Sequence, residues 1–335
     1  FNFSISATDA NLDDTDTITV FVSIVDHVTE YTMIANGDGT FNFTVPEGDI
    51  IDEMGGIRTV NFRVADSWGD EDTDSSQTID VTKTSSFVWI APADGSFQPG
   101  SGVYSFDITN NGNYEDTFTV AAMSDNGWIA SGSSSQMVTV AKGTTETFTI
   151  TMDVPYVTAG LVDSWSATAI ADNDDTQTGS HDGQTTVASV SGVSVTVGTS
   201  TGSALPNGQV NYFFTITNTG NSDDDFTYST NSANGWDLVD GAGATTLAMG
   251  ASETITVGHT VVGNANSGNS DTITFTSGSA YETATTTTEQ SYGVSIAFDS
   301  STDNVLAPGS AFTVTYTVTN NGNGADSFSV FFESS

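Results

Sequence analysis

The pattern Thr-Asn-x-Gly-Asn occurs three times in this chain of 335 residues, at positions 109–113, 217–221 and 319–323. An Asp and a Phe follow each copy at a similar distance, as Asp116 and Phe118 follow the first. Self-similarity at a long and nearly constant period predicts successive copies of one small structural unit. An array of copies favours length, spacing and avidity over a single catalytic pocket.

Other features recur with the same spacing and place the domain boundaries. A Pro-containing turn precedes each strand that leads into the repeat, and Asn-Gly-Trp follows the first two copies, ending at Trp128 and Trp236. We therefore expect domains at 85–189 and 190–290, and at 291–335 the N-terminal half of a further module.

Apolar residues alternate with Thr, Ser or Asp in many short segments, for example at 104–108, 212–216 and 312–318. Period-two alternation is typical of strands with one face on a core and one face in water. No segment sustains the apolar spacing of three and four that indicates a helix. The sequence predicts an all-β fold built as a tandem array of antiparallel β-sandwich modules.

This order of turns, strands and motifs over residues 85–335 resembles a known class of domains. Together with Val154-Pro155 and Ala159-Gly160, it is similar to the bacterial and archaeal Ig-like modules of the cell-adhesion-related (CARDB-like) and alpha-galactosidase-associated type. The resemblance implies an immunoglobulin-like sandwich of about seven strands. It implies little about function, because such modules are spacers and accessory domains in many secreted proteins.

The first 84 residues differ from the repeats. Two Asp-rich segments, 7–16 and 65–74, each lead into an alternating strand and resemble the closing hairpin of cadherin-like or PKD-type modules. Two divisions stay open: residues 1–28 are the C-terminal part of a truncated module and 29–84 a compact β-sandwich module, or both hairpins belong to one sandwich.

These Asp-rich turns are the candidate metal sites. Calcium takes about six to eight oxygen ligands, which Asp residues at alternate positions of a loop supply. Neither turn has the twelve-residue EF-hand spacing, and solvated turn residues are the alternative. The candidate ligands of Ca²⁺ are Asp9, Asp13, Asp14 and Asp16 in the first turn, and Asp66, Asp70, Asp72 and Asp74 in the second.

The charge balance restricts the possible partners. The chain has 42 Asp and Glu residues against four Lys and Arg, for a net charge of −38. Four scattered cations cannot form the basic surface that nucleic acid or an anionic membrane needs. Salt screens such charges, with a Debye length of ~3 Å at 1 M, so the composition favours saline water. The 20 Phe and nine Tyr residues argue against disorder.

The sequence gives little support for a catalytic function. There is no Cys, and the three His residues, His27, His181 and His259, lie in different modules, so a catalytic triad requires contributions from separate domains. We expect no enzyme. The repeated Asn-Gly loop is expected to form a hairpin or bulge between two strands. Trp128 and Trp236 are expected in the core, with exposed sugar-binding platforms as the alternative.

These observations favour an extracellular, cell-surface structural protein of a microbe from a saline environment: a surface stalk, surface-layer component or filament subunit. The chain opens on Phe1 within a strand pattern, and we take it as an internal piece of a longer secreted protein. The expected partners are other copies of itself, neighbouring surface proteins and cations, with no membrane insertion in this segment. The alternatives are adhesin or carbohydrate-binding modules, or accessory domains of a large secreted hydrolase.

Overall fold

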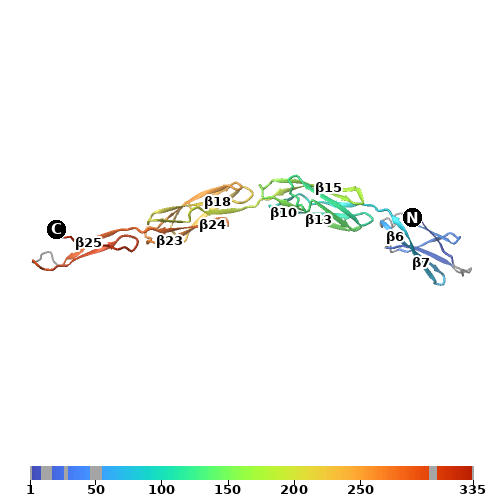
Figure 1. The fold of residues 1–335 in the computed structure, drawn as a ribbon, viewed down its shortest axis with the longest axis horizontal. Coiled ribbons are helices and arrows are strands. Elements are labelled where there is room, and N and C mark those ends of the chain that lie inside the picture. Colours follow the sequence, from blue (N-terminus) through green and yellow to red (C-terminus); the bar gives the residue numbers. More distant parts are fainter. Residues whose placement is uncertain (1, 9–16, 26–28, 46–54, 302–307, 334–335) are drawn as a thin grey trace. The chain divides into compact units, whose positions relative to one another are not determined.

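The computed structural model describes residues 2–8, 17–25, 29–45, 55–301 and 308–333, and within these residues every regular element is a β-strand (Figure 1). The all-β fold predicted from the period-two alternation is thereby confirmed. The chain divides into two compact units: Phe1–Pro155 with Leu161–Val187, and Tyr156–Gly160 with Ala188–Ser335.

The first unit begins with a sandwich formed by residues 2–81, called here the N-terminal sandwich. One sheet has the order β1-β5-β4 and the other the order β3-β2-β6-β7. Phe3 and Phe41 from the first sheet share a core with Val20, Val22 and Phe62 from the second. The strands are β1 (Asn2–Ser6), β2 (Ile18–Ile24), β3 (Tyr31–Thr32), β4 (Ile34–Ala35), β5 (Thr40–Thr44), β6 (Gly56–Asp66) and β7 (Glu71–Val81).

This sandwich does not divide into segments 1–28 and 29–84. β1 pairs with β5, and β2 pairs with β6, so the strands of the shorter segment find their partners in the longer one. Two short strands have no core of their own, and their apolar faces are buried only against the other strands. The single sandwich that the sequence left open as an alternative is the arrangement observed.

The two Asp-rich segments have different surroundings. β6 and β7 form an antiparallel hairpin whose turn begins at Asp66, as predicted. β1 and β2, on either side of Asp9–Asp16, belong to different sheets, so the hairpin predicted at this place is wrong. Alternation shows that a strand exists and does not show which sheet it joins.

Residues 87–155 and 161–187 of the first unit form the second sandwich, with sheets in the order β13-β10-β8 and β12-β11-β14-β15-β9. Its centre is aromatic: Phe106 is fully buried and stacks on Phe148 at a centroid distance of 5.2 Å, with Trp165 and Phe118 also buried. The strands are β8 (Phe87–Ile90), β9 (Gly95–Phe97), β10 (Gly100–Asn110), β11 (Asp116–Ser124), β12 (Ser135–Val140), β13 (Thr145–Val154), β14 (Val162–Ala171) and β15 (Asp174–Val187).

Residues 193–288 of the second unit form the third sandwich, with sheets in the order β16-β18-β22-β20 and β17-β24-β23-β19-β21. Phe214 stacks on Phe275 at 4.6 Å in its core. The strands are β16 (Val193–Val197), β17 (Thr201–Ala204), β18 (Gln209–Asn218), β19 (Asp224–Ser232), β20 (Asp237–Val239), β21 (Ala242–Leu247), β22 (Ser252–Thr260), β23 (Ser270–Ser277) and β24 (Ala280–Thr288).

The second and third sandwiches share one pairing scheme. In each, the strand that leads into the Asn-Gly loop pairs antiparallel with the same later strand, β10 with β13 and β18 with β22. In each, a short early strand pairs parallel with the last strand, β9 with β15 and β17 with β24. The repeat in the sequence is therefore a repeat in topology.

The second unit ends with a hairpin of β25 (Val294–Ser301) and β26 (Val314–Asn320). Its register, with Ile296 opposite Val318, matches that of β16 and β18, where Val195 lies opposite Ile216. The hairpin thus repeats the first strand pair of the third sandwich.

Candidate functional site

The first Asn of each Thr-Asn-x-Gly-Asn motif holds its loop closed. The buried Asn110 side chain donates from Nδ2 to the carbonyl oxygens of Tyr114 (2.7 Å) and Val140 (2.9 Å), and its Oδ1 accepts from Gly112 N–H (2.8 Å). Every polar group of the amide is used, so burial leaves none unpaired. Asn218 makes the same three bonds, to Ser222, Leu247 and Gly220.

The loop is not the hairpin turn or bulge expected from the sequence. β10 and β11, which flank residues 111–115, lie in different sheets, and so do β18 and β19 around the second loop. Asn and Gly favour tight turns of several kinds, and the local sequence does not distinguish a hairpin from a crossing between sheets. The loop is the connection between the two layers of each sandwich.

Asp116, which follows the first loop, is buried with all its oxygens paired. Oδ1 accepts from Thr117 N–H (2.9 Å) and Asn173 Nδ2 (2.8 Å), and Oδ2 accepts from Ser85 Oγ (2.7 Å) and Tyr114 Oη (3.0 Å). Burial acts to raise the pKa of Asp116, but these hydrogen bonds outweigh it and the pKa is lowered. Asp116 therefore has a structural role.

The second set of predicted calcium ligands surrounds the β6–β7 turn. Asp66 Oδ1 accepts backbone N–H groups of Trp68 (2.9 Å), Gly69 (2.7 Å) and Asp70 (2.8 Å), which shapes the turn. The side-chain hydrogen bond from Ser76, with a backbone bond from the same residue, lowers the pKa of exposed Asp74. The first set, Asp9, Asp13, Asp14 and Asp16, lies outside the described residues.

Two hollows lie beside this turn. One, of about 270 Å³, is lined by Asp66, Asp70 and Asp72 together with Thr8, and a second, of about 300 Å³, by Asp72 and Asp74. In the residues that the structure describes, no three or more His, Asp or Glu side chains converge as metal ligands do. Calcium binding at these eight aspartates stays a prediction.

The repeated tryptophans lie inside their sandwiches. Trp128 is 6% exposed and Trp236 is 7% exposed, and each donates its backbone N–H to a serine hydroxyl, Ser124 or Ser232, at 2.7 Å. A sugar-stacking platform needs an open ring face, which these side chains do not offer. The core position expected for both residues is confirmed.

A buried chain of hydrogen bonds crosses the third sandwich, and sequence reasoning missed it. His259 Nδ1 lies 2.8 Å from Thr286 Oγ1, and Nε2 lies 2.9 Å from Asp271 Oδ2. Ser232 Oγ donates to the same Asp271 oxygen, and Asn234 N–H donates to Oδ1 at 2.8 Å. Burial acts to raise the pKa of Asp271, but bonds from Ser232, Asn234 and His259 lower it overall.

The sequence-based expectation that a triad containing His259 needs residues from separate domains is therefore wrong. His259, Asp271 and Thr286 belong to one sandwich, because strands far apart in sequence meet there. None of the three side chains is more than 1% exposed, so no substrate reaches them. Their arrangement stabilises the interior and offers no nucleophile to solvent.

The second sandwich has Met152 at the register position of His259 and Asp163 at that of Asp271. Asp163 is fully buried; its Oδ1 accepts from Asn126 N–H at 2.8 Å, while Oδ2 has no hydrogen-bond partner among the described residues. A sequence signal existed: Asp163 and Asp271 lie 108 residues apart, the spacing that also separates Trp128 and Trp236.

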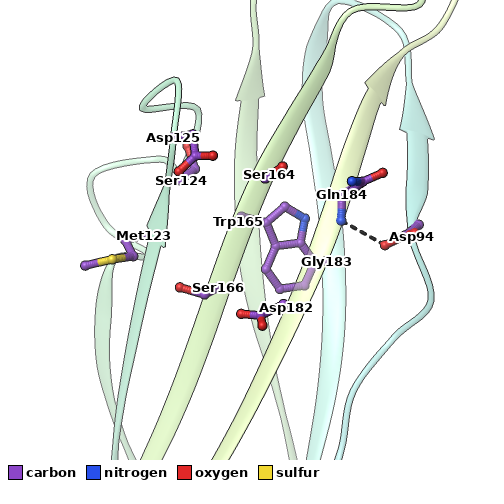
Figure 2. Close-up of a pocket in the computed structure, with 10 residues that line it drawn as sticks. All are labelled: Asp94, Met123, Ser124, Asp125, Ser164, Trp165, Ser166, Asp182, Gly183 and Gln184. Carbon is purple, nitrogen blue, oxygen red and sulfur yellow. Dashed lines mark hydrogen bonds between the residues drawn. The ribbon is translucent and has the colours of Figure 1, made fainter.

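A hollow of about 570 Å³ lies on the second sandwich (Figure 2). Three acidic residues, Asp94, Asp125 and Asp182, contribute to its lining, and Asp94 Oδ1 accepts the backbone N–H of Gln184 at 2.8 Å. Trp165, which also lines it, is only 3% exposed and packs against Gly183. The lining has no His, Lys or Arg, so it offers no acid–base pair near neutral pH and no cation for an anionic ligand.

No family model matches the chain, and no curated protein matches it. Among solved structures, it is similar to a tetra-tandem repeat from the extending region of a large adhesion protein, at 14% identity over 95% of this chain and 83% of that chain, with a TM-score of 0.34. It is also similar to extracellular cadherin domains 3–6 of protocadherin gamma B2, at 10% identity over 81% and 68%, with a TM-score of 0.35.

A third structure, the Ig1–Ig2 domains of Dpr2 in complex with Ig1–Ig3 of DIP-Theta, has 9% identity over 86% of this chain and 93% of that chain, with a TM-score of 0.30.

The described residues contain no helix long and apolar enough to cross a membrane. The sheet orders and the repeated strand pairing show that the chain is a tandem array of all-β sandwich modules.

Proposed function

We propose that this chain is a tension-bearing spacer in an extracellular, cell-surface structural protein. The observation that carries the proposal is the parallel pairing of an early and the last strand in both complete Ig-like sandwiches. Gly95–Phe97 pairs with the end of β15, and Thr201–Ala204 pairs with the end of β24.

This pairing determines how force acts on a module. A pull on the start of β9 and the end of β15 acts along two parallel strands in opposite directions. The hydrogen bonds between them then lie across the pull and share the load, whereas in a hairpin pulled open from its ends they break one at a time. Such a module therefore needs a higher force to unfold when it is pulled from these two strand ends than when its strands are separated one hydrogen bond at a time.

The surface chemistry suits a spacer. The acidic excess keeps neighbouring copies apart at low ionic strength and is screened in saline water. The hydrogen-bonded His259 chain is sealed from solvent, and neither Trp128 nor Trp236 offers a binding platform. These features support a structural role over an enzymatic one.

We also propose that Ca²⁺ binds the Asp-rich turns of the N-terminal sandwich and bridges neighbouring copies into a stalk, lattice or filament. The support is the sequence pattern and the hollow that Asp66, Asp70 and Asp72 line. Carboxylate oxygens are the ligands that calcium prefers.

Localisation tests the proposal. Antibodies raised against this chain should label intact cells of the source organism, and electron microscopy should show the label on surface stalks, lattices or filaments. Label that appears only after cells are broken open would contradict an extracellular role.

A further inference from the structure

The last Asn of each Thr-Asn-x-Gly-Asn loop binds the linker that precedes its own module. Asn113 Oδ1 accepts from Thr84 N–H at 2.9 Å, and Asn113 Nδ2 donates to Thr82 O at 2.9 Å. Both linker atoms belong to the backbone, on either side of Lys83. The amide therefore pairs with the linker as one strand pairs with its neighbour.

The other two loops repeat this pair of bonds inside the second unit. Asn221 accepts from Val190 N–H (2.7 Å) and donates to Ala188 O (3.0 Å). Asn323 accepts from Ser291 N–H (2.7 Å) and donates to Glu289 O (2.9 Å). The linker side chains differ in the three places, while the backbone atoms used are the same.

The backbone of the same Asn reaches a further segment. The carbonyl oxygen of Asn113 accepts from Gly55 N–H (2.7 Å), just before the last hairpin of the N-terminal sandwich. That of Asn323 accepts from Ser267 N–H (2.9 Å), just before the last hairpin of the third sandwich. The carbonyl oxygen of Asn221 accepts from the N–H of Ala159 (2.9 Å), and Ala159 belongs to the second unit, as Asn221 does.

The Gly of the motif is required by the same contact. A Cβ atom on Gly112 would lie 2.5 Å from Thr84 O, and one on Gly220 would lie 2.5 Å from Val190 O. A Cβ on Gly322 would meet Ser291 O in the same way. The linker backbone passes directly against the loop, and only glycine leaves room for it.

We propose that the Thr-Asn-x-Gly-Asn loop is a clasp for the interdomain linker, in which the last Asn is a positioning residue that fixes the linker and, at the first and third loops, also a loop of the preceding module. The clasp takes an extended peptide of any sequence, provided that the third residue has an N–H group. This explains why the Asn-Gly motif recurs while the linker sequences differ.

The matched control is in the same loop. Asn111 is exposed, and no side-chain hydrogen bond of Asn111 occurs among the described residues. Asn113→Ala and Asn111→Ala therefore remove the same group from neighbouring positions. Asn113→Asp keeps the acceptor and loses the donor, so it should give an intermediate effect.

Two readouts on the full chain test the clasp. In Asn113→Ala, amide exchange at Thr84 should accelerate roughly tenfold or more, while Phe118 in the core keeps its protection. Because the chain has no Cys, spin labels at Gln77→Cys and Ser101→Cys report on the joint alone, and their distance distribution should broaden. Asn111→Ala should match the wild type in both measurements.

A linker variant separates the joint from the fold of the second sandwich. Thr84→Pro removes the N–H that Asn113 accepts and leaves the sandwich side chains intact. It should broaden the same distance distribution. A wild-type distribution in Thr84→Pro, or equal behaviour of Asn113→Ala and Asn111→Ala, would overturn the proposal.

Discussion

His259 Nε2 lies 2.9 Å from Asp271 Oδ2 inside the third sandwich, and both side chains are almost completely buried. The second sandwich has the same fold with Met152 in place of the histidine. One scaffold thus holds a hydrogen-bonded His–Asp pair in one copy, and a methionine and a buried aspartate at the same positions in the other. The repeat offers an internal comparison of these two solutions.

Replacing the histidine should destabilise its module. His259→Met leaves Asp271 with the bonds from Ser232 and Asn234 only, and losing a hydrogen bond to a buried charged group costs about 1.5–3 kcal/mol. Amide exchange of β23 in His259→Met, with β14 as the internal reference, measures the loss. The control is His181→Met, read at β14 with β23 as the reference, because His181 Nε2 is buried and has no hydrogen-bond partner among the described residues. Equal effects of the two variants would contradict a stabilising His259–Asp271 pair.

The same carboxylate predicts an acid dependence. The pKa of Asp271 is lowered in the folded protein from its usual value near 3.8, so its stabilising contribution is complete above that value and is lost as pH falls through the folded pKa. Asp271→Asn should therefore be less stable at pH 7 and lose less stability on acidification below about pH 4. Exchange of β23 amides between neutral pH and about pH 3 measures this, with exposed Asp237→Asn as the control. A parallel loss in Asp271→Asn and the wild type would contradict it.

Calcium should raise the melting temperature of the N-terminal sandwich relative to a chelated sample, since an ion that binds only the folded state stabilises it. Asp70→Asn combined with Asp72→Asn should reduce the shift. Asp80→Asn, an exposed change on the same strand β7, should leave it intact. A melting temperature that calcium does not change would contradict calcium binding at these turns.

Salt should stabilise the whole chain. From about 0.1 M to about 1 M salt the Debye length falls from ~10 Å to ~3 Å, which screens repulsion among the 42 acidic residues. The thermal midpoint should rise across this range and rise equally in NaCl and KCl, because screening does not depend on which monovalent cation is present. A rise with one salt alone would indicate specific ion binding instead.

The strands themselves were predictable, because alternation at 104–108 and 212–216 marks one buried face. The partner of each strand was not. The segment before β2 has the same local pattern as the turn before β7, yet β1 and β2 belong to different sheets. Local turn chemistry does not specify which of two layers the chain enters next.

The candidate functional residues also divide into those that the sequence predicted and those whose partners only the fold shows. The burial of Trp128 and Phe118 was predictable from their recurrence beside the Asn-Gly motif. The His259–Asp271–Thr286 chain and the Asn113 bonds to residues 82–84 join positions distant in sequence, and one sequence without its fold does not show such pairs. Repeated spacing marked Asn113 as important and left its partner unknown.

Single-molecule extension of the full chain tests the central claim most directly. The second and third sandwiches should unfold as separate force events, and Ser96→Pro, which disrupts the parallel pairing of β9 with β15, should lower the force of one of them. Ser135→Pro, on the edge strand β12 outside that pairing, should leave the unfolding force unchanged. If Ser96→Pro unfolds at the wild-type force, the parallel strands bear no load and the account of a tension-bearing spacer is contradicted.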